Sequence, residues 1–280
     1  MKIQAIDGKP LSAGGKLLKA SSAPEPEPSD GKTRIYIHLD EGRLSPMLGC
    51  CPNGTVTVDW GDGTEPDVLT GTSITTVVWT PTHTYAAQGD YVIKLTVDGS
   101  MRLYGQAGSN LYSGLLRYSA TADARNQLYQ NRIQKVKIGD GVVGLESAAI
   151  HSCHGLRSIA FGDEVTYIGG NAFYSCFSLE SLEIPSGITN IPGNAFYGCR
   201  ALASVTVPAS VASIAASAFN SCWGVKFYDF TACAAVPTLA NTNAFSGIAE
   251  DCEIRVPSAL VEEWKGATNW ASYADRIVGV

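Results

Sequence analysis

Apolar residues recur at a fixed spacing of 23 residues through the second half of the chain. Each unit carries a cysteine, a leucine or valine three residues later, and an alanine-phenylalanine pair shortly before the next cysteine. The cysteines are Cys153, Cys176, Cys199 and Cys222. Further apolar or aromatic residues lie six and eight positions after each cysteine, as in a short strand with one buried face. The period therefore predicts similar units that bury their apolar faces against their neighbours, which is a solenoid.

The period extends beyond the four cysteines in both directions. One unit upstream, the same positions hold apolar residues, and Gln130 stands in the place of the cysteine. The last unit departs from the pattern, because Cys233 and Pro237 interrupt it. After it, the sequence predicts a final strand and a short helix over about Ala259–Trp264, with Gly266 as its end. This tail is expected to cap the apolar end of the stack.

The first part of the chain has short runs in which apolar and polar residues alternate. Turn signals such as Asn53-Gly54 separate these runs. The predicted strands cover residues 34–39, 55–60, 72–79 and 91–97. Short strands separated by turns predict a β-sandwich. Upstream, the Pro/Glu-rich segment 23–28 predicts a stiff, extended linker.

The composition is that of a folded chain with few charges. Of 280 residues, 45% are apolar and 16% are charged, against about 25% charged in an average soluble domain. The formal net charge of -6 has the wrong sign for a phosphate backbone, so nucleic acid is not an expected partner. No run reaches the roughly 18–20 apolar residues of a membrane-spanning helix, so membrane insertion is not expected. The N-terminus shows no apolar run of a secretory signal.

The repeating pattern A-F-x-x-C-x-x-L-x-S, followed by alternating apolar residues, resembles the BspA-type leucine-rich repeats of bacterial surface proteins. The resemblance covers about residues 130–248, with a capping tail to residue 280. Known members of that family are mostly extracellular adhesion or host-protein-binding proteins. The resemblance therefore implies a binding role and an extracellular or cell-surface location.

A second resemblance covers about residues 33–99. The segments Val58–Thr64, His83–Tyr85 and Gly89–Val97 resemble a polycystic-kidney-disease-type (PKD) immunoglobulin-like domain. Such domains usually serve as spacers or interaction modules on extracellular bacterial proteins and are not catalytic.

Together these patterns predict a mainly β chain in four parts. Residues 1–32 form an N-terminal segment with the Pro/Glu linker, and residues 33–99 form a PKD-like immunoglobulin-like β-sandwich. Residues 100–129 form a connector and the N-terminal cap of the solenoid. Residues 130–280 form a BspA-like leucine-rich-repeat solenoid of 23-residue repeats with a C-terminal cap helix.

The cysteines have two interpretations. Thiols on neighbouring turns, roughly 5 Å apart as adjacent strands are, could bind a metal or oxidise. Alternatively each cysteine is a small buried hydrophobe, because phenylalanine precedes it and leucine follows it by three residues. The closest approach to a zinc ligand set is His151, Cys153 and His154, which lacks a fourth ligand. No metal and no cofactor are therefore expected.

Acidic residues around a Gly-Asp-Gly turn raise the question of calcium. They are Asp59, Asp62, Glu65 and Asp67. The calcium loop D-x-D-x-D-G is not present, however, and turn chemistry explains the Gly-Asp-Gly sequence.

Two positions outside the predicted core recur with residues that favour binding. They directly follow the buried phenylalanine and the buried cysteine of each unit. The candidate ligand-binding residues at these positions are Tyr174, Phe177, Tyr197, Arg200 and Trp223. If they point outward, neighbouring units form an aromatic and cationic ridge for a protein or a glycan, because Tyr, Trp and Arg dominate interface hot spots. The alternative is that they cap loops and pack on one another.

No catalytic motif accompanies this ridge. The sequence has no nucleophile elbow, no zinc-protease motif and no phosphate-binding loop, so an enzyme is not expected. The predicted function is that of a non-catalytic binding or adhesion protein that uses the solenoid surface to bind a protein or glycan. The alternative is a structural component of a prophage tail or surface assembly.

Overall fold

The computed structural model describes residues 29–42, 44–104, 114–117 and 129–280. Residues 31–280 form one compact unit, to which the following description refers. This unit is mainly β, as predicted, with short helical segments near its C-terminal end. The predicted linker and most of the predicted connector lie outside the described residues.

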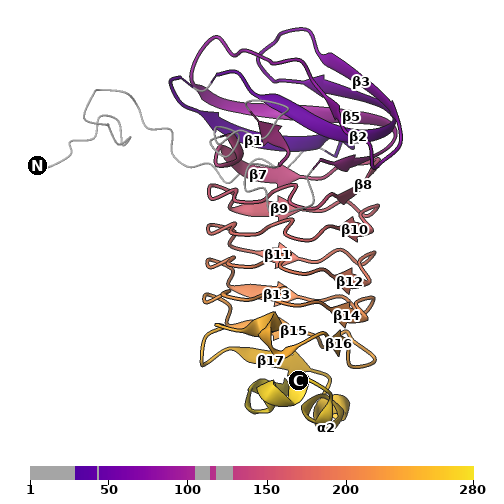
Figure 1. The fold of residues 1–280 in the computed structure, drawn as a ribbon, viewed down its shortest axis with the longest axis vertical. Helices are drawn as coiled ribbons and strands as arrows, with labels where there is room; N and C mark the ends of the chain where they lie inside the picture. Colours follow the sequence, from indigo (N-terminus) through magenta and orange to yellow (C-terminus); the bar gives the residue numbers. More distant parts are fainter. Residues whose placement is uncertain (1–28, 43, 105–113, 118–128) are drawn as a thin grey trace, which may run out of the picture. The chain divides into compact units, whose positions relative to one another are not determined.

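Each repeat contributes two short strands, which lie on two walls of a stack (Figure 1). The first wall contains β9 (Ser158–Ala160), β11 (Leu182–Glu183), β13 (Ser204–Thr206) and β15 (Phe227–Asp229). The second wall contains β10 (Tyr167–Ile168), β12 (Asn190–Ile191), β14 (Ser213–Ile214) and β16 (Thr238–Leu239). Paired strands within a wall are parallel, and Val205 pairs with Leu182 on one side and with Tyr228 on the other, each 23 residues away.

The second wall was not predicted as a set of strands. In β10, β12 and β14 it is built around one buried isoleucine, such as Ile191 or Ile214, and in β16 Leu239 takes this place. These strands are only two residues long, which is too short for an alternating pattern to be recognised in the sequence.

Phenylalanines and cysteines fill the interior of the stack. Phe173, Phe196, Phe219 and Phe245 are stacked in sequence, with centroids of neighbouring rings 5.3, 5.3 and 5.5 Å apart. The thiols link neighbouring units, since Cys176 Sγ donates to Ile150 O at 3.1 Å. In the next unit, Cys199 Sγ donates to Phe173 O at 3.3 Å. Because these sulfurs are fully buried, the geometry favours the interpretation of each cysteine as a small core residue.

The N-terminal strands form a sheet that continues into the repeats. Its members are β1 (Thr33–Leu39), β2 (Met47–Asp59), β3 (Asp67–Thr72), β4 (Val78–Trp79), β5 (Gly89–Leu103) and β6 (Leu116–Arg117). Strand β1 pairs with β7 (Ile133–Lys137), and the end of β5 pairs with β8 (Val142–Leu145). Strands β7 and β8 pair in turn with β9 and β10, so β1 begins the first wall and β5 begins the second.

This continuity places the N-terminal sheet over the first repeat (Figure 1). Ile35 and Leu95 of the sheet belong to the same buried cluster as Val136 of β7. Residue 99, the predicted end of a sandwich domain, lies inside strand β5. The described N-terminal strands therefore cover the apolar end of the stack.

The predicted turn at Asn53-Gly54 is wrong, because both residues lie inside strand β2. Gly54 pairs with Gly71 of β3 and with Gly99 of β5. Its φ is 124°, and a Cβ atom there would lie 2.2 Å from the carbonyl oxygen of Asp98. Glycine is thus required by the close approach of two strands and not by a hairpin.

The predicted strand over residues 72–79 is also wrong. Strand β3 ends at Thr72, and after a turn only Val78 and Trp79 are in a strand. The alternating pattern of this segment therefore does not correspond to one continuous strand.

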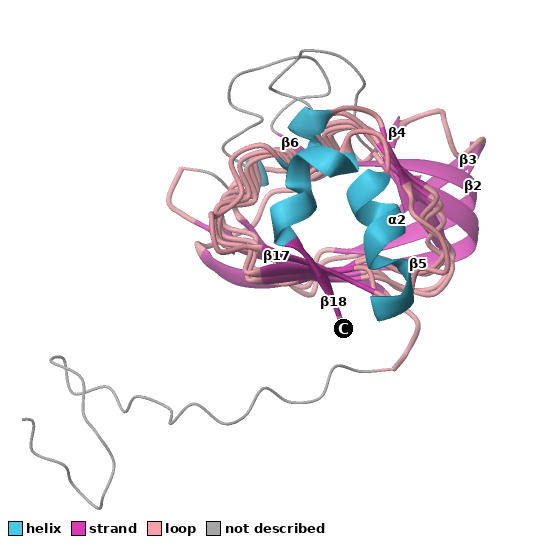
Figure 2. Ribbon diagram, turned by 90° about the horizontal axis from the view of Figure 1, so that it is seen from below, coloured by secondary structure: helices cyan, strands magenta, loops and turns pink. Residues whose placement is uncertain are grey.

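The C-terminal segment covers the other end of the stack. Strands β17 (Glu253–Val256) and β18 (Ile277–Gly279) extend the first wall. The segments between them lie across the end of the stack (Figure 2). They are the 3-10 helices η2 (Ser258–Leu260) and η3 (Trp270–Arg276) and the helix α2 (Val261–Gly266).

Two indoles of this cap complete the core. Trp264 and Trp270 are fully buried, and their rings lie 5.0 and 5.6 Å from that of Phe230. The 3-10 helix η1 (Thr242–Phe245) carries the last phenylalanine of the column, which also contacts Trp270. Helix α2 begins two residues later than predicted and also ends two residues later, since it includes Gly266, the predicted stop.

We expect the variant Phe196→Ala to lose about 3–5 kcal/mol of unfolding free energy, because Phe196 is buried between two parallel phenylalanine rings. Urea unfolding measures this loss. Thr189→Ala, at an exposed position of the same unit, is the control and should stay within about 0.5 kcal/mol of the wild type. Equal stabilities of the two variants would contradict the described core.

We expect Gly54→Ala to destabilise the chain more than Gly63→Ala. Both glycines have positive φ, which costs alanine about 1–2 kcal/mol, but the space around Gly63 is open whereas Gly54 faces a carbonyl oxygen. Thermal unfolding of both variants separates the cost of the positive φ, which both carry, from the cost of the close contact, which only Gly54→Ala carries. Similar losses would show that the strand crossing at Gly54 is not as close as described.

Candidate functional site

The residues that follow the buried phenylalanines and cysteines form two columns along the stack. The tyrosine column contains His151, Tyr174 and Tyr197. The arginine column contains His154, Phe177, Arg200 and Trp223. We call these seven residues together the aromatic ridge. All five candidate residues from the sequence lie in it.

The rings within each column are stacked nearly parallel. Tyr174 lies 5.0 Å from His151 and 4.7 Å from Tyr197, measured between ring centroids, with interplanar angles of 4° and 6°. His154 lies 4.5 Å from Phe177 at 10°. The Cζ atom of Arg200 lies 4.5 Å from the ring centroids of both Phe177 and Trp223. Packing of these residues on one another, which the sequence left as an alternative, is thus what the structure shows.

A residue with left-handed backbone conformation separates the two columns in every unit. These residues are Ser152, Ser175, Gly198 and Ser221, with φ of 55°, 59°, 72° and 60°. The conformation reverses the direction of the side chains over a few residues, so that Phe173 and Cys176 point inward while Tyr174 and Phe177 stay at the surface. It costs a serine about 1–2 kcal/mol. Hydrogen bonds between units, such as Ser175 N–H to Tyr197 O at 2.7 Å, offset this cost.

Stacking leaves ring edges at the surface. Tyr174 and Phe177 each have a neighbour on both faces, so their faces are covered within the columns. Sugar stacking requires a free ring face, and the interior of the ridge does not offer one. The edge of an aromatic ring carries partial positive charge, so the ridge presents positive edges to solvent.

Trp223 ends the arginine column and is 53% exposed. The exposed large hydrophobic side chains of the described residues are Val68, Trp223, Val278 and Val280. Trp223 is the single aromatic residue in this set. An exposed indole beside a cation is the composition of a binding hot spot.

The two histidines of the ridge are poor bases. Burial lowers the pKa of His151, and the neighbouring His154 lowers it further. Burial alone lowers the pKa of His154. Both side chains are therefore neutral at pH 7, and Arg200 carries the charge of the ridge.

The thiols of Cys222 and Cys51 are equally unreactive. Burial raises the pKa of Cys222 to about 12 and that of Cys51 to about 11, so their thiols stay protonated at neutral pH. Metal binding and oxidation both need the thiolate. Within the described residues, no three His, Cys, Asp or Glu side chains converge on a point that could hold a metal ion.

Three of the acidic residues near the Gly-Asp-Gly turn, Asp59, Asp62 and Asp67, are engaged with protein groups. Asp62 accepts from Thr64 Oγ1 at 2.7 Å and contacts His83 Nε2 at 2.8 Å. Asp59 accepts from Lys94 Nζ at 3.1 Å. These contacts match a structured turn.

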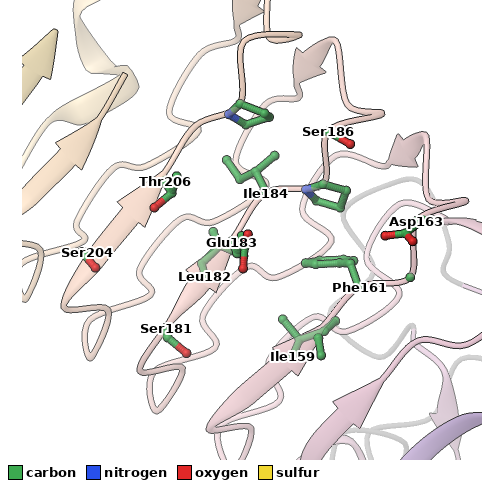
Figure 3. A pocket seen from close by; sticks show the side chains of 14 residues that line it. Ile159, Phe161, Asp163, Ser181, Leu182, Glu183, Ile184, Ser186, Ser204 and Thr206 are labelled. Carbon is green, nitrogen blue, oxygen red and sulfur yellow. The ribbon is translucent and has the colours of Figure 1, made fainter. Parts of the chain in front are cut away.

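A depression of about 670 Å³ lies on the first wall, beside β9, β11 and β13 (Figure 3). Its polar lining side chains include Asp163, Ser181, Glu183, Ser204 and Thr206. Strands β9 and β11 are joined by a single bridge, between Ser158 and Ser181, and the depression opens where this pairing stops. Apolar side chains such as Phe161, Leu182 and Ile184 share this lining with the polar groups. None of the five candidate residues from the sequence lines the depression, whereas all five lie in the ridge.

Residues 124–253 match the BspA type leucine rich repeat region in six copies. Among solved structures, a leucine rich cell surface protein from Faecalibacterium prausnitzii A2-165 is similar at 24% identity, with a TM-score of 0.41. The similarity covers 63% of this chain and 41% of that chain, so this chain matches less than half of that protein's length. No similar sequence was found among curated proteins. None of the described helices is both long and apolar enough to span a bilayer.

We expect the stability of the wild type to fall as the pH drops below 6.5, the ordinary pKa of histidine. The pKa values of His151 and His154 are lowered in the folded state, so the unfolded chain takes up protons first and is favoured as the pH falls. The double variant His151→Tyr/His154→Phe places the residues of the next unit at both positions and keeps the stacks. Urea unfolding at pH 7.5 and pH 5 should show a smaller loss for this variant than for the wild type. An equal loss would assign the pH dependence to other groups.

Proposed function

We propose that this chain is a non-catalytic binding or adhesion protein of the cell surface, which uses the aromatic ridge to bind its partner. The observation that carries this proposal is the exposed end of the arginine column, where Arg200 lies against Trp223. A fixed arginine beside a half-exposed indole loses little conformational entropy on binding and buries a large area.

The surface location rests on the repeat family. BspA-type repeats match residues 124–253, and known members of the family are mostly extracellular. In this proposal the stack is a solenoid of 23-residue repeats, and residues 33–99 are a PKD-like module that holds it away from its attachment point. The pairing of β1 with β7 and of β5 with β8 supports a rigid connection between the two.

The fold supports a passive scaffold and not a mobile catalytic site. The core phenylalanines and the ridge follow the same strand register, so the ridge residues are fixed with respect to one another. Burial shifts the pKa values of His151, His154 and Cys222 toward their neutral forms, which are poor catalysts of proton transfer or nucleophilic attack.

We expect Trp223→Ala to weaken partner binding about 30-fold, because exposed aromatic hot spots contribute about 2 kcal/mol or more. The midpoint of thermal unfolding should stay nearly unchanged, since the side chain is 53% exposed. The measurement is binding of the full chain to an array of extracellular-matrix proteins, mucins and glycans, followed by titration of each bound component.

Val68→Ala is the matched control, because Val68 is an exposed apolar residue of strand β3, outside the ridge. It should bind like the wild type. If Trp223→Ala and Val68→Ala bind equally well, the ridge is not the binding surface. If Trp223→Ala fails to fold, the indole belongs to the core and the proposal loses its main support.

A further inference from the structure

We infer that the partner is a protein that presents a carboxylate to Arg200. This inference rests on the proposed function and specifies the ligand chemistry of the same surface. It follows from the way in which the guanidinium is held and from the lack of an acidic neighbour.

The guanidinium of Arg200 lies over two aromatic rings. Its Cζ atom is 4.5 Å from the ring centroid of Phe177 and 4.5 Å from that of Trp223. A guanidinium that stacks on aromatic rings keeps the N–H donors in its own plane available for hydrogen bonds. A planar fork of N–H donors is matched by a carboxylate that approaches in the same plane and accepts two hydrogen bonds.

Arg200 differs from the other basic residues of its part of the stack. Between Cys153 and Cys252, a fully described segment, the basic residues are Arg157, Arg200 and Lys226. Arg157 lies 3.8 Å from Glu180, and Lys226 lies 3.1 Å from Asp251. Arg200 makes no hydrogen bond or ion pair with any described residue, although it is exposed.

Small uncharged residues lie near Arg200 in the chain and directly after Trp223 in the next unit: Gly198, Ala201, Ala203 and Gly224. Glu180 of the preceding unit, whose backbone oxygen accepts from Ala203 N–H at 3.1 Å, pairs with Arg157 and not with Arg200. A cation that served the stability of the stack would gain from an acidic neighbour of the kind that Arg157 and Lys226 have. The rings that hold Arg200 instead preorganise it for an anion from outside.

The surrounding ridge favours an isolated carboxylate over other anions. Its ring edges are partially positive and attract carboxylate or carbonyl oxygen. The whole chain has a net charge of -6, which repels polyanions such as nucleic acids and sulfated glycans. A single Asp or Glu side chain among apolar residues of a protein satisfies both conditions. The covered ring faces exclude sugar stacking in the interior of the ridge.

The test uses the full chain and an array of random dodecapeptides, in which each acidic peptide has a partner with Asn for Asp and Gln for Glu. We expect the wild type to prefer the acidic peptides about tenfold or more. Arg200→Gln should remove this preference and weaken binding by the same factor, while Arg200→Lys should restore part of it. Arg157→Gln, which changes an exposed arginine that already faces an acid, is the matched control and should keep the preference.

A double-mutant cycle tests directly whether Arg200 contacts the acidic side chain of the peptide. For a peptide that binds, the effects of Arg200→Gln and of the acid-to-amide change should not add, because each removes the same contact. Additive effects, or equal binding of acidic and amide peptides, would overturn the inference. An Arg200-dependent signal on a parallel array of sialylated and uronic-acid glycans, without a peptide signal, would also overturn it.

The outcomes separate this inference from the proposed function. If Trp223→Ala weakens peptide binding but Arg200→Gln does not, the inferred contact between Arg200 and a carboxylate is wrong, and the ridge remains the binding surface. If Trp223→Ala leaves all binding unchanged, the proposed function itself fails. Thermal unfolding of each variant shows whether the stack is intact.

Discussion

The stacking of equivalent residues at the spacing of neighbouring strands is the constraint on which the rest of this structure depends. Parallel pairing holds units at about 4.8 Å from one another, and a flat ring is the side chain that fills such a spacing with contact on both faces. The buried phenylalanines do this with centroids 5.3 Å apart. The ridge obeys the same rule outside the core, since Tyr174 and Tyr197 lie 4.7 Å apart. The surface is therefore a consequence of the core.

A stack built in this way has two apolar ends, and the chain closes them by different means. At the N-terminal end, β1 and β5 pair with the two strands of the first unit, so hydrogen bonds and apolar contacts are continued together. At the C-terminal end, Trp264 and Trp270 pack against Phe230, and Trp270 also packs against Phe245, the last ring of the column. Neither of the two caps follows the 23-residue repeat, because a further repeat would only expose a new apolar end of the stack.

The periodic part of the molecule was predictable, since a residue that recurs in the same position must recur in the same environment. This argument identified the buried cysteines and placed Tyr174 and Trp223 at the surface. It could not supply contacts between distant and non-repeating segments. The pairing of Gly54 with Gly99 overrides a local turn signal, and nothing near either glycine in the sequence indicates the other. The contact of Arg200 with two rings could not be predicted from the sequence either. The repeat shows which side chains are neighbours, but it does not show whether the faces or the edges of their rings are exposed to solvent.

Geometry and chemistry are separable along the ridge. Every unit offers the same two positions on either side of a left-handed residue. Along the arginine column the side chains are a neutral histidine, a phenylalanine, a cation and an indole, all at the same spacing. In the proposed function, the fold sets where the partner lies, and the order of the four side chains sets which partner it is. A change of specificity would then require substitutions in this column alone, because the register of the stack is fixed by other residues.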